Sequence, residues 1–245
     1  MAAITDSMDH SHGHGHGPDS PLHHQFEDIE QQNESYIVGM WIFLATEVMF
    51  FGALFLTYTL YRWNYQRDFY IAHEHLDVTL GAINTSVLLF SSFTMVMAVQ
   101  SAQLKRRMHV IVYLLITLAC AFTFLIVKYF EWTSKFADHL YPGAGFQTNA
   151  VAAFHEHALE NGHLAVNMNH AQLFYALYFG MTGLHAFHII VGIGVIIALI
   201  RLWVNKCKTV TLDFVATEMV GLYWHFVDLV WIFLFPLFYL MPKPH

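Results

Sequence analysis

Ionisable side chains lie inside stretches of this sequence that are otherwise apolar enough to lie in lipid. The last such stretch, residues 218–240, carries Glu218, His225 and Asp228. At 100° per residue on a helix, these three side chains fall within about 80° of one another and share one face. Ionisable groups in hydrocarbon are costly and commonly mark proton relays or subunit contacts. The stretch therefore predicts either a proton-linked site or a hydrogen-bond network that holds the helix to its neighbours.

A single acid, Glu47, lies in the first apolar stretch, 11 residues after the expected helix start at Tyr36. At ~1.5 Å per residue this places the carboxyl group near mid-membrane. A lone carboxylate at that depth needs a proton, water or a partner. We expect Glu47 to handle protons, or to hold a lipid or a neighbouring subunit.

Two further pairs stand three residues apart in apolar stretches. Lys128 and Glu131 can form an ion pair on one helix face near the outer surface. His185 and His188 lie about 60° apart and face the same side of their helix. Haem ligation by these histidines is a weak alternative, because it needs ligands from facing helices and only His225 is available elsewhere.

Histidines also gather in two polar segments. Residues 1–35 form a polar tail, expected to be flexible, in which His alternates with Gly; Gly gives no preorganised site, so metal affinity there is weak. A second group lies in the long connection at residues 133–171, which lacks a defined third and fourth ligand. The weak metal candidates are His12, His14, His16, His155 and His157.

Composition places the chain among integral membrane proteins. Hydrophobic residues make up 56% of it and charged residues 12%, about half the charged share of a soluble domain. The mean hydropathy is +0.44. The formal charge of -7 argues against a nucleic-acid partner. Cys120 and Cys207 lie at different depths and cannot pair, so redox chemistry would belong to a partner.

Five apolar segments have the ~20 residues needed to cross the hydrocarbon core of a bilayer. They predict an all-α fold, a polytopic membrane bundle that forms one domain over residues 36–245. Small and hydroxyl-bearing residues of the second segment, among them Gly81, Ser91 and Ser92, predict close helix packing. We expect transmembrane helices at residues 36–61, 78–102, 109–131, 172–203 and 218–240.

Basic residues in the short connections predict the orientation, because such connections stay on the cytoplasmic side. Lys105, Arg106 and Arg107 follow the second helix, and Arg201 and Lys206 lie near the end of the fourth. In a five-span bundle these connections lie on the same side. We therefore expect a cytoplasmic N-terminus, with the long connection and the C-terminus outside.

Four motifs stand in order on successive predicted helices. They are Ala-Thr-Glu-Val-Met-Phe-Phe at 45–51, Lys-Tyr-Phe-Glu-Trp at 128–132, Gly-Leu-His-Ala-Phe-His-Ile-Ile-Val-Gly at 183–192 and Tyr-Trp-His-Phe-Val-Asp-Leu-Val-Trp at 223–231. Together they resemble subunit III of haem-copper cytochrome c oxidases, in a five-helix bacterial form. The likeness covers nearly the whole chain after the tail.

This resemblance implies a non-catalytic subunit of a proton-pumping aa3-type oxidase in the bacterial inner (plasma) membrane. It implies packing against catalytic subunit I, in a complex with subunit II, and no catalytic centre of its own. Haem a and copper would belong to those partners, while this chain binds phospholipid and supports proton uptake and turnover stability. Glu47 matches the family's carbodiimide-reactive glutamate. The positions that match the family pattern with mostly structural roles are Glu131, His185, His188, His225 and Asp228.

Two alternatives and one departure accompany this interpretation. An accessory subunit of a quinol oxidase or a nitric oxide reductase would share the fold. A histidine-rich metal transporter is the alternative from another class, and it would need ligands converging at mid-membrane. Many members of the family that the chain resembles have seven helices, so a two-helix bundle is missing here or is supplied by another chain.

Overall fold

The computed structural model describes residues 28–143, 146, 154, 166–207 and 214–242. In these parts the chain forms helices and no strand, and five of the helices are long and apolar enough to cross a membrane. The expected all-α, five-span bundle is thereby confirmed. A short helix that the sequence did not predict, α2 (Gln66–His73), connects the first two spans. The spans are α1 (Ile29–Asn64), α3 (Val78–Gln103), α4 (Arg107–Ala137), α7 (Met168–Val204) and α9 (Val215–Tyr239).

The helices begin and end outside the apolar stretches that predicted them. The α1 helix starts seven residues before Tyr36, because the Asp28 carboxylate accepts a hydrogen bond from the Gln31 amide at 2.7 Å and caps the first turn. The end of the predicted tail is therefore helical. Likewise, α4 runs on to Ala137 and α7 begins at Met168, which shortens the expected 133–171 connection at both ends.

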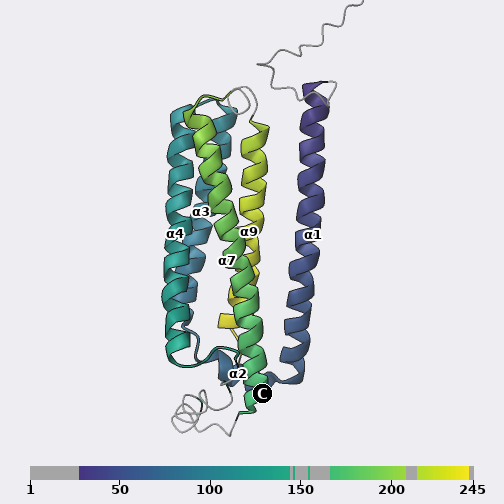
Figure 1. Ribbon diagram of the computed structural model, residues 1–245, viewed down its shortest axis with the longest axis vertical. Coiled ribbons are helices and arrows are strands. Elements are labelled where there is room, and N and C mark those ends of the chain that lie inside the picture. Colours follow the sequence, from purple (N-terminus) through teal and green to yellow (C-terminus); the bar gives the residue numbers. More distant parts are fainter. Residues whose placement is uncertain (1–27, 144–145, 147–153, 155–165, 208–213, 243–245) are drawn as a thin grey trace, which may run out of the picture.

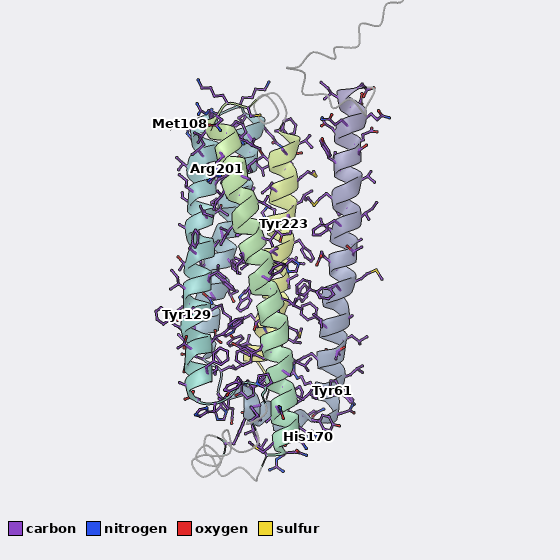
Figure 2. All side chains as sticks on the ribbon, in the orientation of Figure 1. Tyr61, Met108, Tyr129, His170, Arg201 and Tyr223 are labelled. Atoms are coloured by element: carbon purple, nitrogen blue, oxygen red, sulfur yellow. The ribbon has the colours of Figure 1, made fainter. Side chains whose placement is uncertain are left out.

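Figure 1 shows α3, α4, α7 and α9 side by side as a four-helix bundle, with α1 standing beside it next to α9. The α3–α4 turn and the C-terminal end of α7 lie at the end of the bundle where α1 begins. In Figure 2, Met108 and Arg201 mark this end, and Tyr61 and His170 mark the opposite one. The basic connections thus share one end, as the sequence predicted; which end faces the cytoplasm stays a prediction.

Small residues let aromatic side chains of α9 lie against the neighbouring helices. A Cβ atom added at Gly192 of α7 would lie 2.7 Å from a ring carbon of Trp224, and one at Gly81 of α3 would lie 2.9 Å from a ring carbon of Phe235. The indole nitrogen of Trp224 donates a hydrogen bond to Ser91 Oγ at 2.8 Å. The close packing expected of the second span is confirmed by these contacts.

Candidate functional site

Four polar side chains form a buried cluster between α4, α7 and α9. Lys128 Nζ donates to Glu131 Oε2 at 3.0 Å, to Tyr178 Oη at 3.2 Å and to Tyr239 Oη at 3.0 Å. Both tyrosine hydroxyls in turn donate to the other carboxylate oxygen of Glu131, that of Tyr178 at 2.7 Å. Lys128 and Glu131 are each 3% exposed. Every charge in the cluster is therefore paired inside the protein.

The ion pair that the spacing of Lys128 and Glu131 predicted is present. It lies inside the bundle, however, and does not anchor the helix at the outer surface. Lys128 also lies over the ring of Trp231, 5.1 Å from its centroid. Tyr239, the last residue of α9, is 1% exposed because its hydroxyl reaches this ion pair.

Glu47 of α1 contacts His188 of α7 halfway along the first helix. The distance from Glu47 Oε2 to His188 Nε2 is 3.2 Å. The other ring nitrogen of His188, Nδ1, lies 2.8 Å from the carbonyl oxygen of Leu184. The side chains of Glu47 and His188 are 20% and 13% exposed, so the pair lies at the edge of the contact between α1 and α7. Phe51 packs edge-on against the imidazole at 5.3 Å and covers one side of it.

The hydrogen bonds of His188 determine how many protons this pair holds. A carbonyl oxygen only accepts, so Nδ1 must carry a hydrogen and donate it to Leu184. Nε2 and an ionised Glu47 would then present lone pairs to each other, unless one proton lies between them. That proton makes either a carboxylic acid or an imidazolium. A proton shared between Glu47 Oε2 and His188 Nε2 would therefore complete the hydrogen bond of this pair.

His185 does not share a site with His188. Its ring lies in the bundle core, 5.2 Å from the ring of Trp231 and 5.5 Å from that of Phe124, whereas His188 faces α1. A 60° offset on the helix is enough to direct two side chains to different neighbours when these neighbours meet at that edge. The expectation that both face one side is wrong. With His225 directed to α3, the three rings do not converge and do not fit a bis-histidine haem.

Glu218, His225 and Asp228 share one face of α9, as the helical repeat predicted, and the first two contact α3. Glu218 accepts a hydrogen bond from Gln103 Nε2 at 2.7 Å near the helix ends. His225 Nδ1 lies 2.8 Å from Ser92 Oγ. Asp228 is 2% exposed, yet neither of its oxygens has a hydrogen-bond partner within the described part of the chain. This acid is therefore not part of a satisfied network within the described part of the chain.

Sequence reasoning missed Tyr178 and underrated Ser92. Tyr178 lies two turns before His185 in α7, and its hydroxyl is at the depth of Lys128. A comparison of depths between spans is the signal that would have found it.

The five weak metal candidates in the tail and the long connection lie outside the described residues. Among the described residues, no group of three or more His, Cys, Asp or Glu side chains could hold a metal ion.

The fold defines a multi-pass helical membrane protein with two pairs of ionisable side chains in its spans, Lys128–Glu131 within α4 and Glu47–His188 between α1 and α7. The family described as "Cytochrome c oxidase subunit III" matches residues 165–242. The chain is 29% identical to "Quinol oxidase subunit 3" of Bacillus subtilis over 220 residues, covering 87% of this chain and 92% of that one. It is 27% identical to "Cytochrome c oxidase subunit 3" of Alkalihalophilus pseudofirmus, covering 90% and 93%.

A third relative is longer than this chain. "Heme-copper oxidase subunit I+III" of Aeropyrum pernix is 32% identical over 213 residues, which is 83% of this chain but 22% of that protein. The matches to the two third subunits leave only about a tenth of either chain uncovered. The chain belongs to the subunit III family of haem-copper oxidases.

Proposed function

We propose that this chain is the third, non-catalytic subunit of a proton-pumping haem-copper oxidase in a bacterial plasma membrane. The observation that carries the proposal is the similarity to third subunits over about nine tenths of their length. Catalytic subunit I is the partner, supported by the Aeropyrum protein, whose name joins subunits I and III. Subunit II completes the complex, haem a and copper belong to these partners, and phospholipid covers the apolar faces of this chain.

Cytochrome c is the electron donor that we propose, because the family model that matches carries that name and the 45–51 motif resembles that branch. A quinol is the second candidate, favoured by the match to the Bacillus subtilis quinol oxidase subunit. The metal-transporter alternative loses its support. The two relatives that this chain matches over about nine tenths of their length are both named as oxidase subunits.

The complex purified through a tag on this chain tests both statements. We expect a larger haem-bearing chain to co-purify, an a-type haem band in the reduced-minus-oxidised spectrum, and oxygen consumption with reduced cytochrome c. Oxygen consumption with a quinol alone, or b-type haem alone, would select the second donor. A chain that purifies alone as a stable monomer would contradict the oxidase proposal itself.

The Glu47–His188 pair is the site that we propose for the proton-linked role of this subunit. Replacing Glu47 by Gln should shorten the lifetime of the oxidase under turnover by roughly fivefold, with the haem content unchanged. The amide cannot share a proton with His188, and a loss of about 1 kcal/mol at such a contact corresponds to this factor. The measurement is the decay of oxygen consumption and of proton release over many turnovers.

Two further variants make this test specific. His188→Gln should give the same decay, because it removes the other half of the same pair. Glu30→Gln, an identical chemical change at an exposed first-turn position of α1, should leave the lifetime as in the wild type. Equal lifetimes for Glu47→Gln and the wild type over many turnovers would remove the proton-linked role.

A further inference from the structure

A groove of about 370 Å³ lies between α3 and α9, in the half of the bundle that contains the α3–α4 turn. Its walls are apolar apart from Gln100, and its two ends are polar. Gln103 and Glu218 form a hydrogen bond at the end near the helix termini. His225 lines the other end, seven residues or ~10 Å deeper into the bundle. The apolar wall residues are Val96, Val99, Met219, Gly221 and Leu222.

The imidazole of His225 connects this groove to the bundle interior. Its Nδ1 lies 2.8 Å from Ser92 Oγ, on the side of α3. Its Nε2 makes no hydrogen bond within the described part of the chain. This nitrogen is nevertheless not fully buried, because it is absent from the set of buried atoms without a partner. Because His225 lines the groove and its Nδ1 contacts Ser92, we infer that Nε2 faces the open space. Water in the groove would supply the partner that this atom lacks.

Asp228 lies one helical turn beyond His225 and is 2% exposed. Ser92, which contacts His225, is the nearby hydroxyl on α3, although neither oxygen of the Asp228 carboxyl has a hydrogen bond within the described residues. Leaving a polar group buried and unpaired costs free energy, and an unpaired charge costs far more. A carboxyl in this position holds its proton, and Ser92 is the group through which that proton can leave.

We propose that the α3–α9 groove is a water-filled entry through which Asp228 exchanges its proton with the aqueous phase at the α3–α4 end of the bundle. Asp228 gives its proton to Ser92 Oγ, Ser92 gives its hydroxyl proton to His225 Nδ1, and His225 gives the proton on Nε2 to water in the groove. The reverse sequence returns the proton, so charge and atoms balance. The volume holds on the order of ten waters.

Water fits the groove better than an acyl chain does. An acyl chain would satisfy the apolar walls, but it would leave His225 Nε2 without a hydrogen bond. The polar pair Gln103–Glu218 at the outer end gives water a hydrated opening. This exchange route is separate from Glu47 on α1, and it does not depend on the proposed oxidase function.

Infrared spectroscopy of the complex in lipid nanodiscs tests the route, because the carbonyl stretch of a protonated carboxyl moves when its proton is replaced by deuterium. The Asp228 band is the one absent from Asp228→Asn. We expect this band to move in D2O, and to move about tenfold more slowly in His225→Phe and in the groove-filling Leu222→Trp. Leu229→Trp, which adds the same ring at a 49% exposed position of α9, is the matched control and should exchange like the wild type.

Each other result overturns the proposal or a part of it. An unchanged rate in both groove variants means that Asp228 does not exchange through the groove. A slower rate in Leu222→Trp alone means that water reaches Asp228 without His225. A band that exchanges only after lipid is removed means that lipid fills the groove.

If the variants fail to fold, treatment of the unaltered complex with a water-soluble carbodiimide tests water access instead. Mass spectrometry should then find Asp228 modified. An unmodified Asp228 beside modified surface acids would contradict water access to this carboxyl.

Discussion

Replacing Lys128 by Met should destabilise the bundle by about 3–5 kcal/mol. The change leaves Glu131 as a buried charge without its ion-pair partner, and an uncompensated charge in a protein interior carries a penalty of this size. The two tyrosine hydroxyls still donate to Glu131, but neither neutralises it. The measurement is unfolding of the complex in nanodiscs, followed by tryptophan fluorescence against temperature or denaturant.

A double substitution separates loss of the ion pair from loss of packing. Lys128→Met combined with Glu131→Leu removes both charges, and it should recover most of the lost stability, because apolar residues commonly replace a buried ion pair at little cost. Arg201→Met, which removes an exposed positive charge near the end of α7, should change the unfolding free energy by less than about 0.5 kcal/mol. A loss below about 1 kcal/mol for Lys128→Met would contradict the buried pairing.

Replacing Trp231 by Ala should cost about 3–5 kcal/mol, the range for a large buried aromatic side chain. Trp231 is fully buried and touches three other helices. Its ring contacts Phe124 of α4 at 4.8 Å and His185 of α7 at 5.2 Å, and its indole nitrogen donates to Thr85 of α3 at 3.1 Å. Lipid cannot fill the resulting cavity, so the van der Waals contacts that hold membrane helices together are lost.

Comparison with two other tryptophan variants tests this explanation. Trp231→Phe keeps most of the ring contact and loses the hydrogen bond to Thr85, so it should cost about 1 kcal/mol. Trp63→Ala removes a tryptophan that is 76% exposed at the end of α1, and it should leave the unfolding transition close to that of the wild type. Similar losses for Trp63→Ala and Trp231→Ala would show that Trp231 does not join the four helices.

Residue types and local spacing were enough to predict part of the candidate site. The pairing of Lys128 with Glu131 depends on three residues of one helix, so the helical repeat alone predicted it. The shared face of Glu218, His225 and Asp228 followed from the same repeat. Local spacing could not predict their partners, because Gln103 and Ser92 are more than 100 residues away in the chain and reach α9 only through helix packing.

The sequence alone determined that this chain is an all-α, five-span membrane protein, because apolar runs of this length cross hydrocarbon as helices, whose backbone groups bond within the segment. Its motifs also pointed to the family. Only the tertiary structure decided that His188 faces Glu47 while His185 faces the core, that Tyr178 and Tyr239 surround the ion pair, and that Asp228 has no partner among the described residues. Helix rotation and helix contacts decide such pairings, and a pattern within one helix contains neither.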